Sequence, residues 1–275
     1  MTAYLPELLD DPAVLMAALA AVLLVGLSKG GLGGAFALMG VPVLALVMPP
    51  VQAAALLLPI LLMMDAVSLW AWRGWWNAAV LRAMLPAAVL GIVLGWLAAA
   101  VTSEAAVRLI VGVVALGFVG HMLLARLRLR FAFRRDASGA LPESASSGET
   151  AAGRVKAWFW GTMAGFTSFV AHAGGPPFQV YTLPMRLDPR VYTGTSVVFF
   201  AVVNAVKVLP YAALGLFDAP LLGAALAMLP LAVLAVLAGA ALVRRMRPAV
   251  FYPFMYAMVA LVGAKLVHDG LRGLF

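Results

Sequence analysis

The sequence contains no cysteine, and it has few charged residues for its length. Without cysteine there is no disulfide framework, no thiolate metal site and no thiol nucleophile. Charged residues make up 11% of the 275 positions, whereas soluble globular domains typically contain about a quarter. The three histidines do not form the HExxH spacing of a zinc hydrolase. These shortages argue against a soluble domain and against an enzyme, and we expect no catalytic residues, no cofactor and no metal.

Apolar residues, in contrast, make up 65% of the chain. A bilayer core about 30 Å thick takes roughly 20 apolar residues per helix. The composition therefore predicts an all-α integral membrane protein, a polytopic helical bundle of about eight to ten membrane segments. The apolar runs cover approximately residues 12–27, 36–48, 51–72, 78–101, 105–125, 155–170, 177–185, 191–214, 220–243 and 249–267.

One polar stretch divides the apolar runs into two halves. It opens with a basic run from Arg126 to Arg135 and continues into a segment rich in Ser, Gly, Ala and Glu, which is typical of a flexible linker. We therefore expect an N-terminal membrane repeat at residues 1–126, a cytoplasmic linker at 127–154 and a C-terminal membrane repeat at 155–275.

The two halves resemble each other at a nearly constant offset. Adding 139 to the residue number carries Pro50 onto Pro189 and Asp65 onto Asn204, and the offset becomes 144 after a short insertion. With five segments in each half, the second half begins on the opposite side of the membrane from the first. The sequence therefore predicts two inverted repeats.

Lysine and arginine are unevenly distributed between the loops. With the N-terminus outside, most of the basic residues lie at the cytoplasmic ends, and the outer loops 49–50, 102–104, 172–176 and 217–218 contain none. This asymmetry predicts that both termini lie outside, and it explains the net charge of +8 without a nucleic-acid partner. We expect an aromatic belt at the membrane interface, formed by Trp70, Trp72, Trp75 and Trp76.

Two apolar runs, 36–48 and 177–185, are short for a full crossing, and each follows a glycine-rich cluster. Non-helical backbone at membrane depth survives only where it is buried in protein or lines a cavity. Matching interruptions in inverted halves indicate a transport site, and helix-end amides suit an anion. The alternative role of glycine is close helix packing, which we expect of Gly91 and Gly95. The glycines expected to bind substrate are Gly33, Gly34, Gly174 and Gly175.

Three charged residues, Lys29, Asp65 and Lys207, lie in or beside apolar runs. A charge at the bilayer centre costs at least about 2.5 kcal/mol, so its default interpretation is functional. Alternatively, Lys29 snorkels to the inner surface, or Lys207 forms a structural ion pair with Asp65. The spacing of three residues places Asn204 beside Lys207 on one helix face, and Ser68 beside Asp65 on another. If these faces meet, Asp65 either neutralises Lys207 or carries a coupling proton.

Uncharged hydrogen-bond donors near the second glycine-rich cluster complete the set of candidate site residues. His172 can donate to an anion or titrate near neutrality, and its alternative is a loop histidine at the outer interface. Gln179 and Thr195 add an amide and a hydroxyl, although hydroxyls commonly bond to their own helix.

Four motifs stand out: Gly31-Leu32-Gly33-Gly34, His172-Ala173-Gly174-Gly175-Pro176-Pro177, Thr193-Gly194-Thr195-Ser196 and Asn204-Ala205-Val206-Lys207. They resemble the motifs of the TauE/SafE family of sulfite exporters. The resemblance covers nearly the whole chain. It implies a transporter of the bacterial inner membrane, built from two inverted repeats, that moves sulfite or small organosulfonates outward. The first half has Ala53-Ala54-Ala55 where the second keeps Thr193-Gly194-Thr195, so we expect the second half to carry more of the recognition chemistry.

We therefore expect a secondary transporter that exports small sulfur-containing anions by alternating access between the repeats. Lys29 and Lys207 would supply positive charge, and Asn204, His172 and Thr195 would supply hydrogen bonds. The alternatives are an anion channel or importer of the same architecture, and a non-transporting membrane scaffold. The expected partners are a small anion and the lipid bilayer. Proton coupling and assembly as a homodimer are left open.

Overall fold

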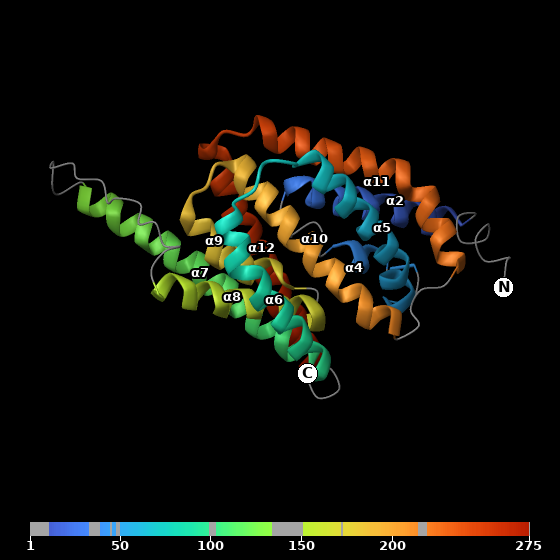
Figure 1. Cartoon of the computed structure of the whole chain (residues 1–275), viewed down its shortest axis with the longest axis horizontal. Coiled ribbons are helices and arrows are strands. Elements are labelled where there is room, and N and C mark those ends of the chain that lie inside the picture. Colours follow the sequence, from blue (N-terminus) through green and yellow to red (C-terminus); the bar gives the residue numbers. More distant parts are fainter. Residues whose placement is uncertain are drawn as a thin grey trace.

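The computed structural model of the chain is built of helices joined by short turns (Figure 1). It describes residues 11–32, 39–44, 46–47, 50–98, 103–133, 151–171, 173–213 and 219–274. Within these ranges there is no β-strand. The all-α fold predicted from the composition is therefore confirmed.

Every apolar run found in the sequence contains a helix in the described residues. The α-helices are α2 (Pro12–Leu27), α4 (Gly40–Leu44), α5 (Pro50–Ala71), α6 (Ala78–Ala98), α7 (Glu104–Phe133), α8 (Ala151–Ala171), α9 (Gly175–Thr182), α10 (Pro189–Ala213), α11 (Ala219–Arg245) and α12 (Pro248–Leu274). A π-helical turn, η1 (Ser28–Leu32), continues α2, and a 3-10 turn, η2 (Leu183–Met185), continues α9.

Six helices in the described ranges are long and apolar enough to cross a membrane, which agrees with a multi-pass membrane protein. Two of the other helices are the short segments expected from the sequence, α4 with 5 residues and α9 with 8. The six spans are Pro12–Leu32, Ala78–Ala98, Glu104–Leu124, Pro189–Leu209, Leu226–Arg245 and Pro248–Leu274.

The ends of the expected linker, residues 127–154, are helical. Helix α7 continues through part of the basic run as far as Phe133, and α8 already begins at Ala151. Arginine and leucine are good helix formers, so composition alone does not end α7 where the apolar run ends. Its C-terminal part extends away from the other helices (Figure 1). The rest of the linker, residues 134–150, lies outside the described residues.

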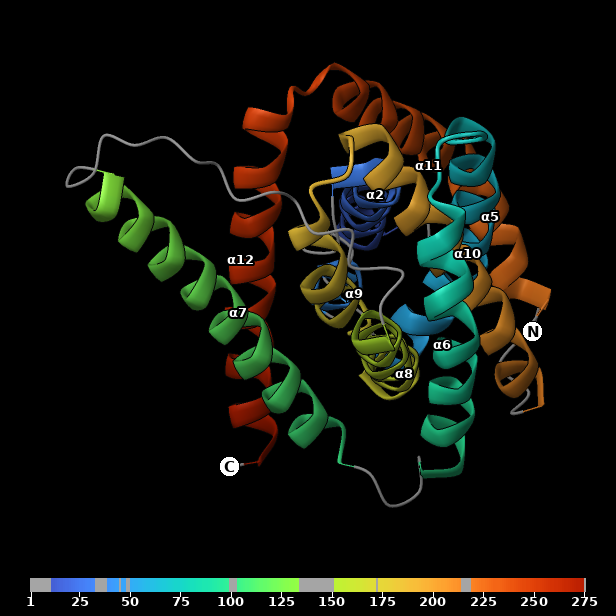
Figure 2. The ribbon, with the colours of Figure 1, turned by 60° about the vertical axis from the view of Figure 1, so that its left-hand side comes forward.

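The two halves of the chain pack into one body. Helix α2 with η1 lies against α11, and α6 lies along α8, so each of these pairs joins one half to the other. Helix α5 also contacts α10, and α7 crosses α12 (Figure 2). In both views α7 and α12 lie on one side of the molecule, and α2, α5, α10 and α11 lie on the other. Each half therefore contributes helices to both sides.

Glycines allow the closest helix contacts, those between α6 and α8. A Cβ atom added at Gly91 would lie 2.1 Å from the carbonyl oxygen of Thr162, and one added at Gly165 would lie 1.9 Å from that of Ala88. A Cβ at Gly95 would lie 3.2 Å from the side chain of Phe169. The packing role predicted for Gly91 and Gly95 is therefore confirmed, and Gly165 shares it.

We predict that Gly165→Ala lowers the midpoint of thermal unfolding of the protein in detergent. The added methyl group collides with the backbone of α6, and overpacking of this kind typically costs about 1–3 kcal/mol. The matched control is Gly117→Ala in α7, where nothing lies within 4 Å of the added atom. Alanine is the better helix former, so the control should keep or slightly raise the midpoint. Equal midpoints for the two variants would contradict the close packing of α6 and α8.

Candidate functional site

The first helix break lies in η1, where the backbone leaves helical geometry at Gly31. Its φ of 132° is strained for residues other than glycine. Side chains from the end of α5 and from the residue that follows it bind the carbonyl groups just before Gly31. The Ser68 hydroxyl donates to the Lys29 carbonyl at 3.1 Å, and the Trp72 indole N–H donates to the Gly30 carbonyl at 3.0 Å. Ser68 and Trp72 therefore satisfy two backbone carbonyl groups beside the break.

The expected position of Trp72 in an interfacial belt is wrong. Trp72 is only 1% exposed, because its indole N–H bonds to the break and the guanidinium of Arg244 lies over its ring. Arg244 also donates a hydrogen bond to the carbonyl of Ala71. The remaining members of the expected belt are exposed, namely Trp70, Trp75 and Trp76.

Asp65 is the centre of a buried polar cluster. Its Oδ1 atom lies 2.5 Å from the Lys29 Nζ atom, and its Oδ2 atom accepts a hydrogen bond of 2.6 Å from the Asn204 side-chain amide. Asp65 is 5% exposed, and a carboxylate buried to this degree needs such partners. Lys29 is therefore held by an ion pair to Asp65 and is largely shielded from solvent. The contact brings together η1, α5 and α10.

Lys207 lies one helical turn beyond Asn204 on α10 and is also 5% exposed. Its Nζ atom donates to Ser168, with distances of 3.1 Å to the hydroxyl and 3.3 Å to the carbonyl oxygen. Because Asn204 bonds to Asp65, the ion pair of Lys29 and Asp65 lies about one helical turn from Lys207 along α10. In the described part of the chain Lys207 forms no ion pair with a carboxylate. The sequence suggested the carboxylate of Asp65 as a partner for Lys207, but in the structure it pairs with Lys29.

The second helix break, between α8 and α9, lies beside the partner of Lys207. The Ala173 N–H donates to the carbonyl of Thr167 at 3.0 Å, and the Thr167 hydroxyl donates to the Ala173 carbonyl at 3.2 Å. Gly174 packs on Ser168, because a Cβ added at Gly174 would lie 2.8 Å from the Ser168 Cβ. Ser168 was missing from the expected site residues. The offset of 139, which places Lys29 opposite Ser168, is the signal that identifies it.

Two further candidates lie on α9 and do not bond directly to the cluster. Gly175 begins α9, with nothing within 4 Å of an added Cβ. Gln179 is buried, at 5% exposure, and its carbonyl accepts the N–H of Leu183 at the end of the helix. The remaining expected residues of the two breaks, Gly33, Gly34 and His172, lie outside the described residues.

Thr195 lies away from the cluster, near the other end of α10. Its hydroxyl accepts the backbone N–H of Asn77 at 2.8 Å and donates to the carbonyl of Val191 at 2.6 Å. The separation from Asn204 along the helix is about 13 Å. The structure therefore places Thr195 where it holds the turn between α5 and α6, and does not bring it to Lys207.

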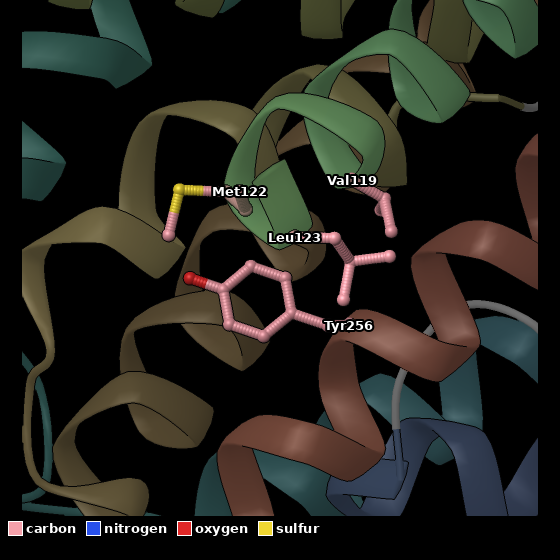
Figure 3. A pocket seen from close by; sticks show the side chains of 4 residues that line it. All are labelled: Val119, Met122, Leu123 and Tyr256. Carbon is pink, nitrogen blue, oxygen red and sulfur yellow. The ribbon is translucent and has the colours of Figure 1, made fainter. Parts of the chain in front are cut away.

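Two hollows in the described residues lie elsewhere. One, of about 20 Å³, lies between α7 and α12 and is lined by Val119, Met122, Leu123 and Tyr256 (Figure 3). It has room for about one water molecule. The other, of about 520 Å³, is an open hollow on the N-terminal half of α8. Asp65 and Lys207 are packed inside the protein, and neither of these two hollows is lined by them.

Comparison with known proteins identifies the family of this chain. No curated protein and no solved structure matches the sequence. The sequence model of the sulfite exporter TauE/SafE family matches residues 18–266, a range that contains both helix breaks and the whole buried cluster. This is a family of membrane transporters, and the match covers nearly the whole chain. The chain therefore belongs to the sulfite exporter TauE/SafE family.

Proposed function

We propose that the protein is a secondary transporter that exports sulfite and small organosulfonates across the bacterial inner membrane. The observation that carries this proposal is the difference between Lys29 and Lys207. Lys29 is neutralised by Asp65, whereas the amine of Lys207 is bonded only to Ser168 in the described residues. A buried ammonium group without a carboxylate partner is costly, and a bound anion supplies the missing charge. Lys207 is thus the main binding group for the substrate.

Two inverted repeats form the framework of this proposal, and a pair of equivalent hydrogen bonds supports them. The offset of 139 carries Lys29 onto Ser168 and Ser68 onto Lys207. In the first half, the Ser68 side chain donates to the carbonyl of Lys29, 39 residues earlier. In the second half, the Lys207 side chain donates to the carbonyl of Ser168, again 39 residues earlier. The donor is a serine in the first half and a lysine in the second. In both halves it donates to the carbonyl at the equivalent position.

The contact between Asp65 and Asn204 supports a two-fold axis at the same place. These residues are equivalent by the offset of 139, and they bond directly to each other. Equivalent residues meet in this way when they lie beside the axis that relates them. The helix contacts agree, because α5 packs on its equivalent α10, and α7 packs on its equivalent α12.

The burial of the cluster favours alternating access over a channel. A channel needs a continuous water-filled path lined by its selective groups. Asp65 and Lys207 are each 5% exposed, so access from either side requires movement of one repeat against the other. In this proposal Asp65, which is held by Lys29 and Asn204, acts as a counter-ion and does not carry a coupling proton.

The arginines at one end of the bundle support the proposed orientation. Arg190 lies over the ring of Trp75 and donates to the carbonyl of Arg244, and Arg73 lies over Trp70. Arginine and tryptophan gather in this way at a cytoplasmic membrane interface. In the proposed topology this end is the cytoplasmic end, with both termini outside.

We predict that Lys207→Gln lowers the flux of sulfite and of methanesulfonate into proteoliposomes by about tenfold or more, because it removes a buried positive charge. Glutamine retains a donor for Ser168, so the fold should be kept. The matched control is Lys156→Gln, which removes an exposed lysine of α8 and should leave the flux unchanged. Unchanged flux in Lys207→Gln would contradict the site, and an absence of flux with the wild-type protein would contradict the function.

The absence of cysteine makes the orientation directly measurable. We predict that Ser103→Cys, between α6 and α7, reacts with a membrane-impermeant maleimide added outside intact cells. Arg247→Cys, between α11 and α12, should react only after the membrane is opened, because it lies at the arginine-rich end. Both positions are exposed in the structure, so burial does not limit labelling. The reverse labelling pattern would overturn the proposed topology.

A further inference from the structure

We propose that Asp65 determines the valence of the transported anion. It leaves the buried cluster with one net positive charge, which selects monoanions over dianions. The inference rests on the proposed function, since it requires an anion to bind beside Lys207. It goes beyond that function by naming the residue that sets the charge preference and the class of anion that follows.

The charge of the site comes from three side chains. Asp65 and Lys207 are the charged residues among the buried polar groups of the described chain. The side chain of Lys29, at 15% exposure, joins them through its ion pair with Asp65. The other polar groups in contact with them, Asn204, Ser68 and Ser168, are uncharged. With the amine of Lys207 protonated, two positive charges and one negative charge leave the cluster with a net charge of +1.

A net charge of +1 favours a ligand of charge −1. Charges interact more strongly in a buried site than in water, so an excess of either sign is costly. A monoanion beside Lys207 gives a neutral site and favours the protonated amine. A dianion would leave an uncompensated negative charge close to the carboxylate of Asp65. The Ser168 hydroxyl, which accepts from Lys207, can at the same time donate to an oxygen of the anion.

The favoured substrates are therefore anions with a sulfur–oxygen head and a single charge. Alkanesulfonates carry one negative charge at any pH near neutrality. Sulfite is accepted in its singly protonated form, and sulfate, which is doubly charged near neutrality, is rejected. Methanesulfonate and sulfate are similar in size and shape, so comparing them isolates the effect of charge.

Asp65→Asn is the variant that changes the charge with the least change in structure. The chain already has an asparagine at the equivalent position, Asn204. After rotation of the Asn204 amide, its oxygen can accept from the new amide, while the new side-chain oxygen still accepts from Lys29. The site then carries a charge of +2, and the hydrogen-bonded connection between α5 and α10 is kept.

The test is the ratio of sulfate flux to methanesulfonate flux in proteoliposomes at neutral pH. The wild-type protein should favour methanesulfonate, and Asp65→Asn should raise the ratio by about tenfold or more, because one full charge is removed from the site. The double variant Lys29→Met with Asp65→Asn restores a charge of +1 and should return the ratio to the wild-type value. A purely structural role of Asp65 does not predict this recovery.

The outcomes separate the inference from the function on which it rests. Wild-type flux of methanesulfonate with an unchanged ratio in Asp65→Asn would overturn the inference and leave the proposed function standing. If Asp65→Asn transports neither anion, the methanesulfonate flux of the double variant Lys29→Met with Asp65→Asn decides whether the inference holds. Recovery of methanesulfonate flux supports the inference, and no recovery overturns it. An absence of wild-type flux for sulfite, methanesulfonate and sulfate would overturn both proposals.

Discussion

The ion pair between Lys29 and Asp65, extended by Asn204, is the interaction on which the rest of the site depends. It joins the first helix break to α5 and α5 to α10, so one carboxylate links elements from both halves of the chain. A buried charge is tolerated only with such partners, so Lys29, Asp65 and Asn204 fix one another's positions. Because the carboxylate of Asp65 is fully engaged, Lys207 depends on Ser168 alone for its described contacts.

The helix breaks and the buried charges form one system. Ser68 and Trp72 bind the carbonyl groups that the first break exposes, and this holds Lys29 in reach of Asp65. At the second break, Gly174 packs on Ser168, which carries the amine of Lys207. A movement at either break therefore changes the surroundings of a buried lysine. This coupling between backbone and charge is what a transporter needs in order to open a closed site.

The sequence predicts the membrane fold and the charged residues of the site well, because burying a charge is so costly that its position alone is informative. Lys29, Asp65 and Lys207 were found in this way, and Asn204 was found as the equivalent of Asp65 in the repeat. Neutral residues carry no such signal. Thr195 was assigned to the site because it is a hydroxyl in a motif, but it bonds to Asn77 and to its own helix. Ser168 was missed, and Trp72 was placed at the interface, since only tertiary contacts distinguish these roles.

The central claim is that an anion binds at the buried lysine that no carboxylate neutralises. Calorimetric titration of methanesulfonate into the purified protein in detergent tests it most directly, because binding is measured without transport. Saturable binding is expected for the wild-type protein, and its loss is expected in Lys207→Gln. Equal affinity in the two proteins would contradict anion binding at Lys207.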